Sequence, residues 1–161
     1  MTTKSLISLE NIIDASQGKI DDLKTLLENG ANPNTIIDGC PILIHMLRKL
    51  RPKRNIEITQ NIKQAVDLFL KAGANPRTLD WQNHTAFFQV QNYIIERLCS
   101  MKEASGDSAV LASQQAELDE VKNISKLLSD SGAGMTPKEL IVISAYYQNK
   151  PIPQEESDDE Y

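Results

Sequence analysis

Apolar residues recur three and four positions apart along most of the chain, which is the spacing of one face of an α-helix. The clearest stretches lie at residues 20–27, 62–70 and 121–128. A capping box, Thr136-Pro137-Lys138-Glu139, marks the start of a last helix. The pattern predicts helices at residues 6–16, 20–29, 41–50, 59–72, 85–99, 114–130 and 137–148.

The same four residues, Gly-Ala-Asn-Pro, follow two of these helices, at positions 30–33 and 73–76. Glycine ends a helix because it adopts a left-handed conformation without steric cost, and the proline prevents the helix from resuming. A degraded copy, Gly132-Ala133-Gly134, follows a third helix. These three similar stops predict stacked repeat units, with turns near 31–40 and 74–84, a shortened turn near 132–136, and a loop at 101–113.

The stretch from Ala15 to Asn34, with Gly18, Leu26-Leu27 and the Gly-Ala-Asn-Pro word, resembles the second half of an ankyrin repeat followed by its β-turn finger. Residues 80–88 are similar to the finger and helix start of that family. The resemblance covers about residues 8–148 and implies an all-α ankyrin-repeat solenoid of about seven helices with short β-turn fingers. Leu43 and Phe88 stand where the family usually has histidine, so the usual hydrogen bonds between repeats are expected to be missing.

The resemblance also implies a domain organisation. Residues 1–150 would form one domain, with repeat units at about 6–40, 41–84 and 85–135 and a half repeat at 136–150. The turns between helices near 51–58 and 101–113 are longer than the family's. Residues 151–161 would follow as a disordered acidic tail.

Repeat solenoids usually bind other proteins along a concave surface, here formed by the fingers and inner helices. Trp81, the only tryptophan, is expected at a finger tip, where an indole in water adds nothing to stability but suits an interface. The alternative is that Trp81 folds back onto its own finger or onto the preceding one. By correspondence with the family, the binding positions are Ile36, Ile37, Asp38, Leu47 and Arg48 in one unit, and Arg77, Trp81, Gln82, His84, Asn92 and Tyr93 around the next.

The formal net charge of the 161 residues is −5, which equals the charge of the tail, so the body is neutral. We consider three roles for the tail. It could keep the protein soluble, and it resembles the glutamate-rich C-terminal translocation signals of bacterial effectors. Ser157 also resembles an acidophilic kinase site. The acidic residues are Glu155, Glu156, Asp158, Asp159 and Glu160.

Residues 48–54 form a basic segment that either ends a helix in solvent or binds an acidic partner or the chain's own tail. The neutral body argues against nucleic acid as the partner. The last helix has a wide apolar face, and Ile141 projects to the other side. The face either packs on the preceding unit or serves as a surface for a partner or for self-association. The candidate residues for this secondary patch are Lys49, Arg51, Lys53, Arg54, Ile141 and Tyr147.

Catalytic and metal chemistry find little support in the sequence. His45 and His84 fall in different units, and neither has Cys, Asp or Glu at metal-ligand spacing. Cys40 and Cys99 are predicted to be small buried hydrophobes in a reducing compartment. We therefore expect no enzymatic activity, no cofactor and no metal.

The N-terminus lacks a secretory signal and no apolar run reaches membrane-span length, which predicts a cytoplasmic protein, or one in the host cytosol if it is a translocated effector. The sequence as a whole predicts a protein–protein interaction module that binds a folded partner and no membrane. The alternatives are an inhibitor or adaptor that regulates an enzyme, including a secreted bacterial effector, and a structural protein that self-associates through the last helix.

Overall fold

The computed structural model describes residues 6–50, 55–103, 106 and 108–148. These residues form seven helices and one short hairpin, so the chain is all-α as predicted, and each expected helix is present. The elements are α1 (Leu9–Ser16), α2 (Asp21–Glu28), β1 (Ile36–Ile37), β2 (Cys40–Pro41), α3 (Ile42–Arg48), α4 (Ile56–Lys71), α5 (Ala86–Glu103), α6 (Ser108–Asp130) and α7 (Pro137–Tyr147).

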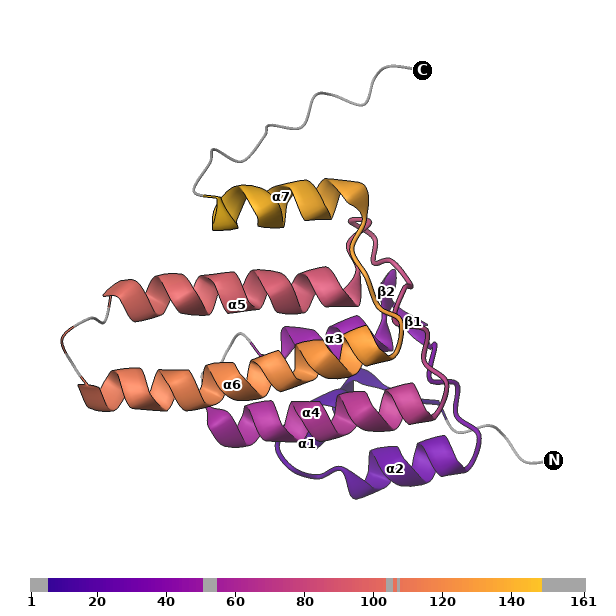
Figure 1. Cartoon of the computed structure of the whole chain (residues 1–161). Coiled ribbons are helices and arrows are strands. Elements are labelled where there is room, and N and C mark those ends of the chain that lie inside the picture. The colour runs from indigo at the N-terminus through magenta and orange to yellow at the C-terminus, as the bar shows by residue number, and fades with distance from the viewer. Residues whose placement is uncertain (1–5, 51–54, 104–105, 107, 149–161) are drawn as a thin grey trace, which may run out of the picture.

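The helices lie in two layers (Figure 1). In one layer α3 packs between α1 and α5, and α7 packs on α5. In the other layer α4 packs between α2 and α6. Contacts of α1 and α3 with α4, and of α5 with α6, join the layers, and the β-hairpin and the later turns lie along one edge, at the right of Figure 1.

Three helices of one layer end in the same way. After α2, α4 and α6, a glycine takes a positive φ of 89°, 101° and 89° respectively. In each case the amide of the following alanine donates to the carbonyl five residues earlier at 2.9 Å, which is the Schellman motif that closes a helix. The three pairs are Ala31 with Leu26, Ala74 with Phe69, and Ala133 with Leu128.

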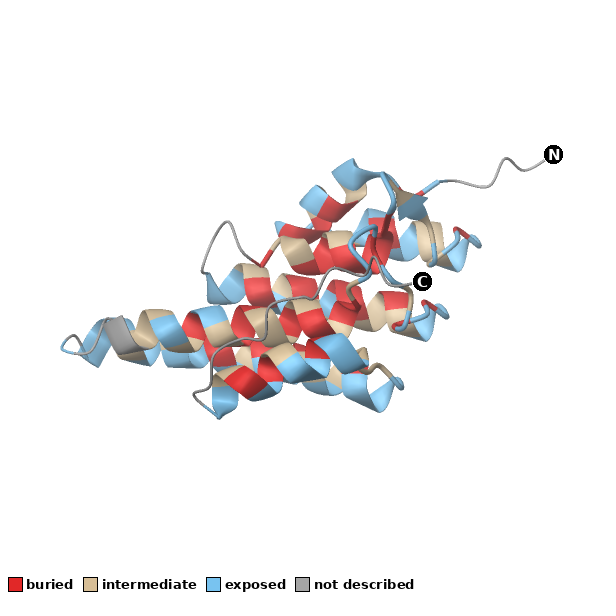
Figure 2. Ribbon diagram, turned by 90° about the horizontal axis from the view of Figure 1, so that it is seen from above, coloured by how far each residue is buried: buried red, intermediate tan, exposed pale blue. Residues whose placement is uncertain are grey.

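The apolar stripes of the sequence meet between the layers, where burial is concentrated (Figure 2). Leu26, Leu27 and Leu70, which belong to the predicted stripes, are only partly buried and pack against the margin of this core. Its fully buried members include Ile12, Leu23, Ile44, Ile62, Val66, Phe69, Val121, Ile124 and Leu128.

The predicted loop at 101–113 is wrong in extent. Helix α5 continues to Glu103 and α6 already begins at Ser108. The segment is rich in Ala and Ser around a single glycine and has no proline, so nothing in it stops a helix for long. Helix α4 begins at Ile56, earlier than the predicted residue 59. The Asn55 side chain caps it there by accepting from the Glu57 amide.

A buried polar cluster joins helices of both layers. Glu117 Oε1 of α6 accepts hydrogen bonds from Thr59, Tyr93 and Arg97. Arg97 Nε lies 2.8 Å from Glu117 Oε2, although its N–H does not point at that oxygen, so this contact is an ion pair rather than a hydrogen bond. Tyr93 also donates to the Leu50 carbonyl at 2.7 Å, at the end of α3.

The cluster corrects one predicted binding residue. Tyr93 is 3 % exposed and belongs to the core, because its hydroxyl finds buried partners that the linear sequence does not reveal. Desolvation by burial, followed by the nearby Glu117 carboxylate, raises the pKa of Tyr93 well above its usual range.

The two cysteines differ. Cys40 is 1 % exposed as predicted, and burial raises the pKa of its thiol. Cys99 was predicted to be buried but is exposed, and its thiol lies 3.4 Å from the Tyr146 hydroxyl of α7. Within the described ranges, no helix is both long enough and apolar enough to span a membrane.

Candidate protein-interaction surface

The first turn is a short antiparallel hairpin in which Ile36 pairs with Pro41 and Ile37 with Cys40. Asp38 and Gly39 link the strands with φ values of 53° and 74°, the signature of a type I′ turn. Ile37 is partly buried beside its pair Cys40, whereas Ile36 is 59 % exposed although its pair Pro41 is buried. His45 Nε2 of α3 donates to the Ile37 carbonyl at 2.8 Å and fixes the hairpin to the helix layer.

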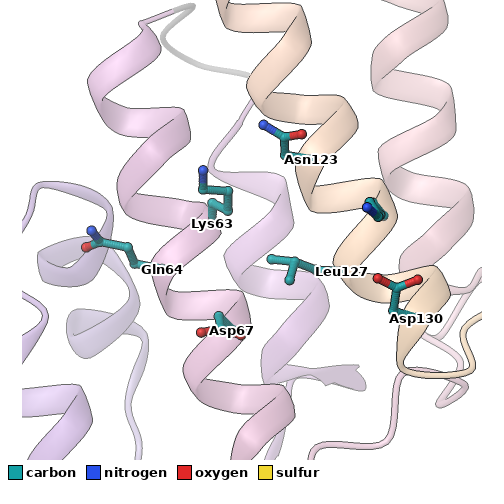
Figure 3. A pocket seen from close by; sticks show the side chains of 7 residues that line it. Lys63, Gln64, Asp67, Asn123, Leu127 and Asp130 are labelled. Carbon is teal, nitrogen blue, oxygen red and sulfur yellow. The ribbon is translucent and has the colours of Figure 1, made fainter.

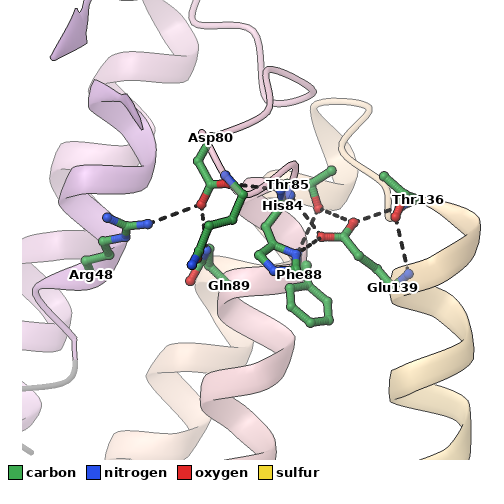
Figure 4. A network of polar contacts seen from close by, with 9 residues as sticks. Arg48, Asp80, His84, Thr85, Phe88, Gln89, Thr136 and Glu139 are labelled. Carbon is green, nitrogen blue, oxygen red and sulfur yellow. Dashed lines mark hydrogen bonds and ion pairs between the residues drawn. The ribbon is translucent and has the colours of Figure 1, made fainter. Parts of the chain in front are cut away.

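The second turn is organised by one buried carboxylate, that of Asp80, which is 4 % exposed (Figure 4). Its Oδ1 accepts from the amides of Gln82 and His84, both at 2.9 Å. Its Oδ2 lies 3.2 Å from Arg48 Nη2 of α3 and 3.3 Å from Gln89 Nε2 of α5. The turn is thus held from within and from two helices.

Trp81 follows Asp80 and is 64 % exposed, as predicted for a finger tip. Its Cβ stands against the first turn: a Cβ built on Gly39 would lie 3.3 Å from the Trp81 Cβ. The base of the Trp81 side chain therefore lies against the neighbouring hairpin, while the residue remains 64 % exposed. We call the exposed side chains at the ends of these two turns the turn-tip surface; it comprises Ile36, Asp38, Trp81 and Gln82.

Successive turns are hydrogen-bonded to one another. Asn34 donates to the Gly73 carbonyl at 3.3 Å and accepts from the Asn75 amide at 2.6 Å. Arg77 Nε donates to the Gly132 carbonyl at 2.8 Å. Hydrogen bonds between units were expected to be missing at Leu43 and Phe88. The described residues have them here instead, from the residue that follows each Gly-Ala-Asn-Pro word to the next turn.

Helix α7 is attached through Glu139, which is 3 % exposed (Figure 4). Its carboxylate accepts from the Thr85 amide and hydroxyl, both at 3.0 Å, at the start of α5. It also accepts from the Thr136 amide at 2.8 Å, which completes the predicted capping box of α7. One carboxylate therefore satisfies the N-termini of two helices.

His84 is not the exposed turn residue that the sequence predicted. Its Nδ1 lies 3.2 Å from Glu139 Oε2, and its ring stacks on Phe88 with the centroids 4.7 Å apart. The side chain is 36 % exposed, so His84 helps to attach α7 and offers only one edge to solvent.

The remaining predicted binding residues divide between surface and interior. Gln82, Asp38 and Arg77 are exposed, and Ile37, Arg48, Lys49 and Asn92 are partly buried. Leu47, predicted as a surface position, is 3 % exposed and belongs to the core, because α3 is buried on most of its circumference. Arg51, Lys53 and Arg54 and the tail at 151–161 lie outside the described residues.

A second apolar surface lies on α7, where Leu140, Ile141 and Tyr147 are 48 %, 52 % and 57 % exposed. The wide apolar face of this helix therefore does not pack fully on the preceding helices. Tyr146, on the side turned toward α5, lies with its hydroxyl 3.4 Å from Cys99 Sγ. This contact, with smaller contributions from desolvation and from Tyr147, raises the pKa of Tyr146 to about 12.

A groove of about 410 Å³ runs between α4 and α6 on the other layer (Figure 3). Two of its charged side chains have partners, since Lys63 binds Glu120 at 2.7 Å and Asp67 binds Lys71 at 2.8 Å. The lining carries two lysines and two aspartates, so it offers no concentrated charge of one sign to a ligand. The lining residues are Lys63, Gln64, Asp67, Asn123, Lys126, Leu127 and Asp130.

Two residues that organise the surface were missed in the sequence. Asp80 precedes the tryptophan in a turn, where Asp often accepts from backbone amides two residues on, and this was an available signal. The reach of Glu139 to Thr85 has no such signal, because it depends on how α7 stacks on α5. Among the described residues, no group of three or more His, Cys, Asp or Glu side chains could hold a metal ion.

Comparison of the chain with models of known protein families, with curated proteins and with solved structures gave no match.

Proposed function

We propose that this chain is a protein-binding module, built as a solenoid of divergent ankyrin repeats, which binds a folded partner through its turn-tip surface and the adjoining inner helices. Two kinds of observation support the repeat architecture. Helices of the same layer pack in sequence order, and three of them end in the same Schellman motif. The turns that follow are hydrogen-bonded from one to the next.

The observation that carries the binding function is Trp81, whose indole is 64 % exposed on a turn that Asp80 holds rigid. An indole in water makes no contribution to the core, whereas buried tryptophan is among the strongest anchors of protein interfaces. Because the turn is already fixed, little conformational entropy is lost when a partner covers it. Ile36, 59 % exposed on the neighbouring turn, extends the apolar contact.

The surface of the inner helices beside Trp81 is polar. Arg48 of α3 and Gln89 of α5 both reach Asp80 and remain partly exposed. Asn92, one turn further along α5, is also partly exposed. The partner would therefore place an apolar side chain on Trp81 and hydrogen-bonding groups over the inner helices, which is the usual arrangement of an apolar centre with a polar rim.

The test is affinity capture from cells that express the protein, with the wild type, Trp81→Ala and Gln64→Ala compared side by side. Gln64 is exposed on α4 in the other layer and serves as the matched control. A partner that the wild type and Gln64→Ala retain, and that folded Trp81→Ala loses by tenfold or more, supports the proposal; about 2 kcal/mol or more per central anchor is typical. Equal recovery by all three would place the binding site elsewhere.

A further inference from the structure

The buried carboxylate that attaches α7 is surrounded by donors (Figure 4). Oε1 of Glu139 accepts from the Thr136 amide at 2.8 Å and from the Thr85 hydroxyl at 3.0 Å, and Oε2 accepts from the Thr85 amide at 3.0 Å. The Thr85 hydroxyl itself accepts from the Phe88 amide at 3.1 Å, so its hydrogen is directed at Glu139. Three donors on two oxygens use the carboxylate purely as an acceptor, which is the role of its ionised form.

The fourth neighbour of this carboxylate is the His84 ring. Its Nδ1 lies 3.2 Å from Glu139 Oε2, and the contact is an ion pair only when the imidazole is protonated. The other donors to Glu139 among the described residues are amides and a hydroxyl, which gain no charge. The His84 side chain is 36 % exposed, so a proton reaches it from solvent without any opening of the structure.

The other charges around this pair are already matched within the described chain. Asp80, in the same turn, accepts from the His84 amide and forms an ion pair with Arg48 of α3 at 3.2 Å. The first two turns of α5 carry no charged residue. Helix α7 carries only Glu139 and Lys138, and Lys138 has an interaction of its own within the chain.

Two positive helix ends also lie beside the pair. Helices α5 and α7 both begin at Glu139, and each N-terminus, with about half a positive charge, disfavours a cation nearby. Their amides donate to the carboxylate, however, so Glu139 already offsets them. Arg77, earlier in the same turn, is held by its hydrogen bond to the Gly132 carbonyl. The full negative charge in contact with the His84 ring is therefore the dominant electrostatic influence on it.

We propose that His84 and Glu139 form a proton-dependent contact that holds α7 on α5. Protonation of the imidazole converts a hydrogen bond into an ion pair and so favours the attached state of α7. Histidine is the side chain whose charge ordinarily changes between about pH 5 and 8. The added stability is therefore present in mildly acidic solution and is lost as the pH rises through neutrality, where α7 opens more often.

Helix α7 is suited to respond to one polar contact. Its exposed side chains Leu140, Ile141 and Tyr147 contribute little to the interface with α5. Elements with few buried apolar contacts open locally, without unfolding of the rest of the chain. Because the contact involves neither Trp81 nor the inner helix surface beside it, this proposal and the proposed binding function can fail independently.

Hydrogen exchange of the full chain, followed by mass spectrometry at about pH 7.5 and about pH 5.5, tests the proposal. Each rate is divided by that of an unstructured chain at the same pH, so the ratio reports how often a helix opens. Protection of α7 in the wild type should rise by about three- to tenfold at the lower pH, as expected for a partly exposed ion pair at a helix end. Protection of α4 and α6 should change much less.

Two variants remove the charge and keep a hydrogen-bonding side chain, His84→Gln and His84→Asn. In either of them, protection of α7 should be the same at the two pH values. His45→Gln is the matched control, because it removes the other histidine and leaves a donor for the Ile37 carbonyl. This control should keep the pH response of the wild type. Thermal unfolding verifies that each variant is folded.

Three results would overturn the proposal. One is equal protection of α7 at both pH values in the wild type. Another is a rise that the folded His84→Gln or His84→Asn variant retains, because the response would then come from a different group. The third is a rise of the same size in α4 and α6, since the proton would then stabilise the whole fold rather than the attachment of α7.

Discussion

Arg97 is the largest side chain that the described core buries fully, and its partner Glu117 is 3 % exposed. A single carboxylate oxygen collects donors from α4 and α5, and Tyr93 extends the cluster to the end of α3. Burying charge is costly unless it is paired, so the cluster sets which residues of the helices lie opposite one another more than it adds net stability. Loss of one partner is then far more harmful than loss of both.

Glu117→Gln should lower the free energy of unfolding by about 3–5 kcal/mol, because it keeps the shape but leaves the Arg97 cation buried without its counter-charge. Urea denaturation measures the change. Glu120→Gln is the matched control on the same helix: its pair with Lys63 is partly exposed, so the loss should stay below about 1 kcal/mol. Similar losses in the two variants would mean that Arg97 is paired or hydrated in some other way.

Because of Tyr93, the stability of the same cluster should depend on pH in alkaline solution. Its pKa is raised in the folded protein, whereas an unfolded tyrosine titrates near 10. The associated stability is complete below about pH 10 and is lost as the pH rises from there toward the folded pKa, because only the unfolded chain then releases the proton. Tyr93→Phe should therefore lose less unfolding free energy than the wild type between about pH 9 and 11; parallel pH profiles would contradict the buried assignment.

At the scale of elements, one carboxylate connects α7 to the rest of the stack. Glu139 accepts from the first residues of both α5 and α7, so it stabilises two helix starts and their relative position. The apolar contact between these helices is modest, since Leu140, Ile141 and Tyr147 face away from it. Helix α7 should therefore depend on Glu139 more than the other helices depend on any single polar residue.

Glu139→Gln should increase hydrogen exchange along α7, because the amide has one acceptor oxygen in place of two and leaves a donor of Thr85 or Thr136 unsatisfied. Mass spectrometry should show the faster exchange in α7 and little change in α4 and α6. Ser144→Ala, an exposed substitution on the same helix, is the control. A uniform loss of protection in all helices would mean that α7 is part of the global folding unit.

The Schellman turns yield a backbone prediction. Gly73 has φ of 101° and open space around its missing Cβ, so Gly73→Ala meets no clash and its cost is the left-handed strain alone, about 1–2 kcal/mol. Gly134 has equally open space but no positive φ, so Gly134→Ala should change the unfolding free energy by less than about 0.5 kcal/mol. Chemical denaturation of the two variants makes the comparison.

The helices could be predicted from the sequence because their apolar spacing and their glycine stops are local signals. What failed depended on tertiary contacts. Tyr93 and Arg97 have the sequence context of surface residues and are buried only because Glu117 arrives from another helix. The exposure of Trp81 was predicted, but the Asp80 contacts that hold its turn come from α3 and α5 and cannot be read from neighbouring residues.

For the molecule as a whole, two layers of helices bury the apolar stripes and leave apolar side chains exposed in several places. They include Ile36 and Trp81 of the turn-tip surface, on the edge where the turns lie. They also include Leu140, Ile141 and Tyr147 of α7, at the end of a layer. The turn-tip surface is rigid and adjoins polar side chains of the inner helices, which suits a specific partner.

The central claim is that Trp81 anchors a partner, and its own fluorescence tests this most directly, since it is the only tryptophan in the chain. Once capture has supplied a partner, a tryptophan-free form of it, or the relevant segment, is titrated into the protein while the emission spectrum is recorded. We predict a solvent-exposed emission that shifts to shorter wavelength and saturates as the indole is covered. Binding that co-sedimentation demonstrates, with the Trp81 emission unchanged, would contradict the account.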